Sequence, residues 1–296
     1  MHEDLEAAAR RIEASGRYVV LRRFEPQRRY HEHDGCTTRT GLIIDTETTG
    51  LEAEDPIIQL ALVEFRYGVE CGRVFDVLGS WSWYEDPGRP IPPEVTRLTG
   101  ITDAMVRGQR IDDDAVGAIL SRASLVIAHN AGFDRPRAEE RIPAFEDKPW
   151  ACSHVEIPWS DEGIASTKLD YLAYRLGFFH AAHRAEDDCL ALLHLLAQPL
   201  PESRRLALSA LLERARRPTA RVWALGSPYE HRALLKARGY RWCDGQRGRV
   251  KCWYRDVDED EARAELDWLA REARCEAARS VTLTALTRHS ERAFLL

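Results

Sequence analysis

The chain has 296 residues, a formal net charge of −6, 44% hydrophobic residues and 30% charged residues. This length allows one large domain and a smaller one, and the composition is that of a globular protein. No apolar run approaches the roughly 18 residues that cross a membrane, so a membrane-spanning protein is excluded. The acidic start does not resemble a secretory signal, and the seven cysteines are scattered. We therefore expect a cytoplasmic protein with reduced cysteines.

Residues 1–40 are predicted to be an N-terminal extension. A short charged helix at residues 5–14 is followed by a strand-like segment and then by several arginines. His31, His33 and Cys36 could be taken for metal ligands, but their spacing matches no closed zinc pattern. We interpret the extension as a polar linker into the main domain.

An apolar strand that runs into two carboxylates begins the main domain. Residues 41–51 read Gly-Leu-Ile-Ile-Asp-Thr-Glu-Thr-Thr-Gly-Leu. Asp45 and Glu47 are two residues apart, so their side chains emerge on the same face while the strand continues. Two carboxylates at a buried strand end repel each other, and a hard divalent cation removes this repulsion. The stretch therefore favours a metal site, with an ordinary polar turn as the alternative.

The elements that follow, up to residue 200, predict an α/β domain. Strands at residues 57–65 and 73–84 are joined by a tight turn, which favours an antiparallel meander. A helix at 112–123, a strand at 125–128, a short strand near 150–157 and a helix at 168–176 come next. Asp134 follows the strand at 125–128, whereas Asp187 and Asp188 fall in the first turns of a further helix, where acidic residues are favourable in any case.

Three motifs in this order resemble those of the DnaQ-like 3′-5′ exonucleases. They are Asp45-x-Glu47, His129-Asn130-x-x-x-Asp134 and His183-x-x-x-x-Asp188. The histidine five residues before the last aspartate is typical of the DEDDh branch, which includes the proofreading epsilon subunit of bacterial DNA polymerase III. The string Leu98-Thr99-Gly100-Ile101-Thr102 is similar to the same family, and the resemblance covers roughly residues 41–197.

The resemblance implies a ribonuclease H-like fold, which is a five-stranded mixed sheet with an antiparallel second strand and flanking helices. It implies that two Mg²⁺ or Mn²⁺ ions are held by Asp45, Glu47, Asp134 and Asp188, because hard cations select oxygen ligands. It also implies that His183 is the general base, since imidazole titrates near neutral pH. The matching contacts to the 3′-terminal nucleotide are Thr46, Thr48, Thr49 and Asn130, with Leu51 and Ile101 as apolar contacts for which core packing is the alternative.

The last third of the chain changes character. Residues 201–218 are predicted to be a linker helix, and residues 219–296 a basic, aromatic-rich α+β module. Between residues 221 and 255, nine lysines or arginines stand against two acidic residues, with tryptophans and tyrosines interleaved. This pattern favours a platform for single-stranded nucleic acid, with Arg238, Arg241 and Lys251 on phosphates and Trp242 or Trp253 on bases. The alternative is a small domain whose aromatics form its core and whose arginines are solvated.

We predict a metal-dependent 3′-5′ exonuclease, formed by residues 41–200, that releases nucleoside monophosphates from DNA 3′ ends in DNA repair or processing. The alternatives are an RNA-directed 3′-5′ exoribonuclease and a non-catalytic nucleic-acid-binding protein. A single-stranded 3′ end is the expected substrate, a homodimer is left open, and no polymerase partner is evident. Truncation after Pro218 is expected to leave the hydrolysis of very short oligonucleotides nearly unchanged, because the predicted catalytic residues lie upstream.

Overall fold

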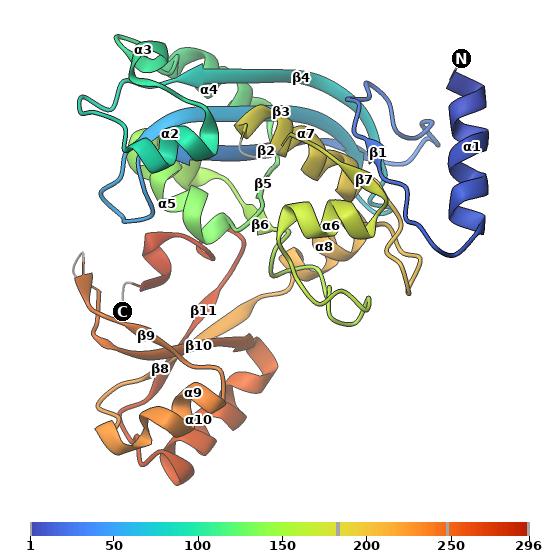
Figure 1. Cartoon of the computed structure of the whole chain (residues 1–296). Helices are drawn as coiled ribbons and strands as arrows, with labels where there is room; N and C mark the ends of the chain where they lie inside the picture. Colours follow the sequence, from blue (N-terminus) through green and yellow to red (C-terminus); the bar gives the residue numbers. More distant parts are fainter. Residues whose placement is uncertain (1, 182–183, 247–248, 295–296) are drawn as a thin grey trace.

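The chain folds into two lobes, each built around its own sheet (Figure 1). The computed structural model describes residues 2–181, 184–246 and 249–294. The large sheet has the strand order β4-β3-β2-β5-β6, and the small one the order β11-β8-β10-β9. Within the described residues, no helix combines the length and the apolar character that a membrane crossing requires.

The large sheet has the mixed arrangement that the resemblance implied. Its strands are β2 (Thr38–Thr48), β3 (Ile57–Gly68), β4 (Val74–Tyr84), β5 (Leu125–Ala128) and β6 (Trp150–Cys152). β3 runs antiparallel to both of its neighbours, whereas β2, β5 and β6 are mutually parallel. β2 is therefore the central strand, buried between β3 and β5, and the fold is ribonuclease H-like.

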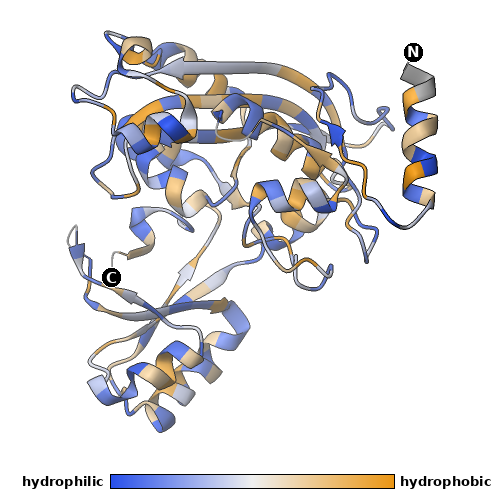
Figure 2. Cartoon of the chain, viewed as in Figure 1, coloured by the Kyte–Doolittle hydropathy of each residue, from blue (hydrophilic) through white to orange (hydrophobic). Residues whose placement is uncertain are grey.

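Helices cover both faces of this sheet, and the alternation of β2 shows which residues meet which helix. The helices are α2 (Pro93–Thr99), α3 (Asp103–Val106), α4 (Asp113–Arg122), α5 (Ala131–Arg141), η1 (Pro143–Asp147), α6 (Leu169–Arg175), α7 (Ala185–Leu196) and α8 (Ala207–Arg216). Leu42 and Ile44 pack with α4 and α5, and Ile43 packs with α6, α7 and α8. Successive strand residues point to opposite faces, and hydrophobic residues occupy the middle of β2 and most of β3 (Figure 2).

Two segments that were interpreted as linkers pack onto the large lobe instead. In the N-terminal extension, α1 (His2–Ala14) precedes β1 (Arg22–Arg23), and β1 pairs in parallel with β7 (Phe178–Phe179). α8 buries Leu208 and Leu211 completely in the core beside α7. The hydrophobic face of α8 therefore makes it a layer of the core of the large lobe, and not a free connection between the lobes.

The small lobe is a four-stranded antiparallel sheet with helices on one face. Its elements are β8 (Thr219–Ala224), η2 (Tyr229–His231), α9 (Arg232–Ala237), β9 (Arg241–Cys243), β10 (Cys252–Asp258), η4 (Glu259–Glu261), α10 (Ala262–Glu272), β11 (Arg279–Leu283) and η5 (Glu291–Phe294). Val222, Leu235 and Leu269 are fully buried where α9 and α10 cover the sheet. The lobe has the predicted α+β character, and β11 completes its sheet by pairing with β8.

After β11 the chain returns to the large lobe through buried polar contacts. The side chain of Arg135, on α5, is fully buried and donates hydrogen bonds to the backbone carbonyls of Ala285, Leu286 and Arg288. Arg288 in turn pairs with Glu156. Truncation after Pro218 would remove these partners, and a buried charged donor without its acceptors is costly. We therefore expect truncation after Pro218 to destabilise the large lobe as well as to remove the C-terminal module.

Candidate active site

The two carboxylates of β2 point to the α7 face of the sheet. Asp45 and Glu47 alternate with the buried Thr46, so both lie on the side of Ile43, as the strand period requires. A third carboxylate, Asp188, comes from the first turn of α7. Oxygen atoms of Asp45, Glu47 and Asp188 all lie within 4.8 Å of one another. The sequence spacing had therefore identified three groups that the fold does bring together.

Asp188, and not the adjacent Asp187, belongs to this cluster. Asp188 lines a pocket of about 600 Å³ together with Asp45 and Glu47. Asp187 lines a different pocket, beside Arg184 and Glu186. The helical twist of α7 separates the two side chains, because consecutive residues on a helix point in different directions.

The fourth predicted ligand, Asp134, lines the same pocket from α5 but is held by a threonine. Its Oδ1 accepts hydrogen bonds from the backbone N–H of Thr46 at 3.1 Å and from the Thr46 hydroxyl at 2.8 Å. Asp134 is not one of the three clustered residues. Thr46, which was predicted to contact substrate, therefore fixes the orientation of an aspartate at the edge of the site.

Burial and mutual repulsion raise the pKa values of the clustered carboxylates. Burial raises the pKa of Asp45 well above its usual range, and the charges of Asp134, Asp188 and Glu47 raise it further. Burial and the charges of Asp188 and Asp134 raise the pKa of Glu47 to about 7. The donor set consists of oxygens alone, which suits Mg²⁺ or Mn²⁺, and a bound cation would relieve the repulsion. These residues therefore fit a divalent metal ion.

Two histidines beside the carboxylates are held by hydrogen bonds. His129 is bonded through Nδ1 to the Ser153 hydroxyl and through Nε2 to the Thr167 carbonyl, and burial lowers its pKa to about 4. His180 Nε2 lies 2.7 Å from Asp188 Oδ1 and its side chain is 2% exposed. No sequence signal had singled out His180. His183, the predicted general base, lies outside the described residues.

The predicted substrate contacts are placed in three different environments. Asn130 lines the pocket with a left-handed backbone (φ 75°) at the start of α5, and Leu51 stands at the pocket with 83% of its surface exposed. The hydroxyls of Thr48 and Thr49 are bonded within the turn after β2, to Gly50 and Asp55. Ile101 is 2% exposed in a separate core cluster with Ile58, Ile91 and Val106. Ile101 therefore packs in the core, which was the alternative stated for it.

α2 contributes a wall of the pocket that the motifs did not identify. The residues that line it are Glu94, Val95, Leu98 and Thr99. Leu98 is 57% exposed, which makes it a second exposed leucine at the pocket besides Leu51. The only sequence signal was the string at residues 98–102. It indicated a likeness to the family, but it did not indicate that these residues lie at the pocket.

The basic residues of the C-terminal module are divided between the two faces of its sheet. Arg238 donates to both carboxylate oxygens of the buried Glu265, on the helix-covered face. Trp253 packs into the core under α9 and α10, and its ring lies 5.4 Å from that of Trp242. Arg241, by contrast, lies on the face that looks toward the large lobe, together with Tyr254. Arg238 and Trp253 therefore stabilise the fold of the module, which was the alternative to nucleic-acid binding.

The comparisons with known proteins agree with this geometry. A family model described as an exonuclease (RNase_T) matches residues 42–196, which is more than half of the chain. A protein named DNA polymerase III subunit epsilon from Treponema pallidum is 32% identical over 178 residues, covering 56% of this chain and 76% of that protein. An epsilon-like protein from Rhodobacter capsulatus is 35% identical over 179 residues, covering 55% of this chain and 24% of that protein.

Two solved structures are similar as well. Exonuclease X in complex with 5′-overhanging duplex DNA is 24% identical with a TM-score of 0.39, covering 57% of this chain and 99% of that chain. E. coli exonuclease I in complex with a dT13 oligonucleotide is 22% identical with a TM-score of 0.44, covering 62% of this chain and 48% of that chain. The family assignment depends on the match in sequence, because both TM-scores are low.

Proposed function

The chain belongs to the exonuclease family of that model, and we propose that it is a metal-dependent 3′-5′ exonuclease that releases nucleoside monophosphates from DNA ends. The observation that carries the proposal is the convergence of Asp45, Glu47 and Asp188 in one pocket, with Asp134 at its edge. The choice of DNA is supported by relatives named as DNA polymerase III subunits. The 3′-5′ direction is supported by the order and spacing of the three motifs.

The residues of the pocket divide the work between metal binding and substrate contact. Two Mg²⁺ or Mn²⁺ ions bound by Asp45, Glu47, Asp134 and Asp188 would stabilise the attacking and leaving oxygens of the phosphodiester. Thr46 orients Asp134 through its two hydrogen bonds. Leu51 and Leu98 offer exposed apolar surface to the terminal bases, and Asn130 offers a polar group beside them.

His183 is the proposed general base, which takes a proton from the attacking water onto an imidazole nitrogen. Replacement of His183 by alanine should lower the turnover rate by roughly 10²–10⁴, the usual contribution of general acid–base catalysis. His180→Ala is the matched comparison, because His180 is buried and its Nε2 lies 2.7 Å from Asp188 Oδ1. A larger loss in His180→Ala than in His183→Ala would reassign the base.

The proposed activity is tested with labelled oligonucleotides in Mn²⁺ and in chelator. DNA and RNA strands of one sequence are compared, single-stranded and duplex, with free and with blocked 3′ ends. We expect release of mononucleotides from free 3′ ends of DNA, and no hydrolysis in chelator. Undiminished digestion of a strand with a blocked 3′ end would refute the direction, faster digestion of RNA would make the chain an exoribonuclease, and binding without hydrolysis would leave a non-catalytic binding protein.

Two adjacent aspartates provide the matched pair of variants for the same assay. Asp188→Asn should abolish hydrolysis, because Asp188 belongs to the carboxylate cluster. Asp187→Asn removes the same charge one residue away, from a different pocket, and should retain hydrolysis. Equal activities of the two variants would contradict the assignment of Asp188.

A further inference from the structure

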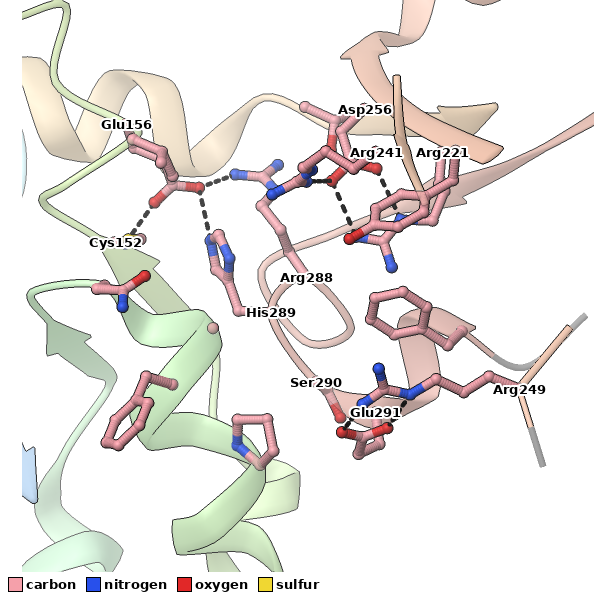
Figure 3. A pocket seen from close by; sticks show the side chains of 18 of the residues that line it. Cys152, Glu156, Arg221, Arg241, Arg249, Asp256, Arg288, His289, Ser290 and Glu291 are labelled. Atoms are coloured by element: carbon pink, nitrogen blue, oxygen red, sulfur yellow. Dashed lines mark hydrogen bonds and ion pairs between the residues drawn. The ribbon is translucent and has the colours of Figure 1, made fainter. Parts of the chain in front are cut away.

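A second cavity of about 600 Å³ lies between the two lobes (Figure 3). One wall is formed by α5, with Phe133 and Arg137, and the other by the face of the small sheet that carries Arg241 and Tyr254. We call this cavity the interlobe cleft. Leu51, Asn130 and Phe133 line both the interlobe cleft and the active-site pocket. The two cavities therefore adjoin, and a linear polymer bound in one can continue into the other.

The interlobe cleft carries positive charge although the whole chain is negative. Its lining contains three carboxylates, Glu156, Asp256 and Glu291, and six arginines: Arg137, Arg214, Arg221, Arg241, Arg249 and Arg288. The lining thus has an excess of three positive charges, one of which is offset by the ion pair of Arg214 with Asp258, in a chain whose formal net charge is −6. Low-dielectric walls concentrate the field of such an excess, so the cleft attracts a polyanion.

Most of these arginines already serve the fold, and Arg241 is the exception. Arg221 binds both oxygens of Asp256, at 2.7 and 2.9 Å, and Arg249 pairs with Glu291 (Figure 3). Arg241 comes no closer than 3.7 Å to Asp256, and its side chain is 65% exposed. Its guanidinium stands 5.0 Å from the ring centre of Tyr254. Because Arg221 already occupies Asp256, Arg241 retains donors for an incoming phosphate.

We propose that the strand whose 3′ end occupies the active site continues through the interlobe cleft, with Arg241 binding one of its phosphates. This inference rests on the proposed exonuclease function and names its substrate as a single strand. A sphere of this volume is roughly 10 Å across, whereas the major groove of B-DNA alone is about 12 Å wide. The size of the cleft therefore favours a single strand over a duplex.

The test measures binding by the full-length protein in chelator, so that no hydrolysis occurs. Fluorescein-labelled oligothymidylates of increasing length are titrated at several salt concentrations. Removal of one protein–phosphate interaction on a single strand flattens the slope of log affinity against log salt by about 0.7. We expect this flattening for Arg241→Ala on long strands, and recovery of most of the slope in Arg241→Lys, which restores the charge.

Arg263→Ala is the matched control. Arg263 lies on α10, on the opposite face of the small sheet, and its side chain is 86% exposed. Its removal takes away the same charge from the same lobe, and the slope should stay that of the wild type. If Arg241→Ala also keeps the wild-type slope, or if both variants flatten it equally, the interlobe cleft is not the path of the strand.

Two further measurements separate this inference from the function on which it rests. A blunt duplex that binds as tightly as the single strand, with the same dependence on Arg241, would overturn the single-strand assignment. The wild-type protein is also assayed with Mn²⁺ on a trinucleotide, too short to extend through the cleft. Hydrolysis of the trinucleotide together with an unchanged slope in Arg241→Ala refutes the inference alone, whereas absence of hydrolysis on strands of every length refutes the proposed function and the inference with it.

Discussion

Both lobes contain carboxylates that are at least partly buried, but the neighbouring groups differ in charge. The neighbours are other carboxylates in the large lobe and arginines in the small lobe. In the large lobe, burial and neighbouring carboxylates together raise the pKa of Asp45 and Glu47. In the small lobe, burial alone would raise the pKa of Asp256 and Glu265, but hydrogen bonds from arginines, joined by Tyr240 at Glu265, lower both values. Burial is common to the two regions, so the partners decide the sign. The region whose charges remain unbalanced is the one where a cation fits.

The largest expected effect is the loss of activity in Asp45→Asn. The amide keeps the shape of the side chain but removes the central anionic ligand, so hydrolysis in Mn²⁺ should be abolished. A rate within about tenfold of the wild type, or about 1.4 kcal/mol in the activation barrier, would show that Asp45 is not a metal ligand.

Asp45→Asn should also stabilise the metal-free protein. The pKa of Asp45 is higher in the folded chain than in the unfolded one, so its charge costs stability above the unfolded value and the cost disappears as the pH falls. We expect a higher melting temperature than wild type at pH 7 in chelator, a difference that shrinks toward pH 4, and a loss of the stabilisation by Mn²⁺. A lower melting temperature in chelator at pH 7 would contradict the repulsion.

The next effect is the destabilisation expected of Arg135→Ala. The guanidinium is fully buried, pairs with Glu139 at 2.6 Å, and supplies donors to three carbonyls of the returning tail. Breaking a buried pair from one side typically costs roughly 3–5 kcal/mol. Urea denaturation should show this loss in Arg135→Ala, whereas the exposed Arg263→Ala should unfold like the wild type. Equal stabilities would mean that the two lobes are not held together by this contact.

A smaller destabilisation is expected of Glu265→Gln, which makes the same kind of change as Asp45→Asn but in the paired region. Glu265 accepts hydrogen bonds from Arg238, Tyr240 and Arg255. Loss of its charge should cost roughly 1–3 kcal/mol by urea denaturation at pH 7. The two variants should therefore change stability with opposite signs in chelator. Two changes of the same sign would break the comparison between the lobes.

The smallest expected effect is the pH dependence of the stability difference between the wild type and Glu265→Gln. The folded pKa of Glu265 lies below its unfolded value, so the stabilisation is complete above the unfolded value, about 4.3, and is lost as the pH falls through the folded one. Between pH 6 and pH 3, wild-type stability should fall more steeply than that of Glu265→Gln, with the largest change below about pH 4.3. Parallel curves would show that the arginines do not hold the charge of Glu265.

The sequence predicted the large lobe well because its signals are local. Apolar runs at residues 42–44, 57–63 and 125–128 become β2, β3 and β5, since β-branched and aliphatic residues suit buried strands. The two-residue period placed Asp45 and Glu47 on one face. The family motifs also indicated Asp188 and not Asp187 as the ligand, and the structure places Asp188 in the cluster.

The small lobe was predicted less well because its charges depend on partners far away in the chain. Arg238 and Arg241 are three residues apart and indistinguishable by composition, yet one pairs with Glu265 and the other stands in the interlobe cleft. Likewise Arg135 reads as one more helical arginine, although it binds carbonyls about 150 residues further on. Such pairings leave no periodicity that a single sequence can reveal.

The sequence by itself thus determined the type of fold, the central strand and the carboxylates of the site, because strand alternation and motif spacing are encoded over a few residues. Only the tertiary structure decided that α8 belongs to the core, that the tail after β11 returns to α5, and which arginine faces the active-site side of the module. These outcomes depend on which surfaces meet when the two lobes pack, and that choice is made by burial and charge pairing between segments distant in the chain.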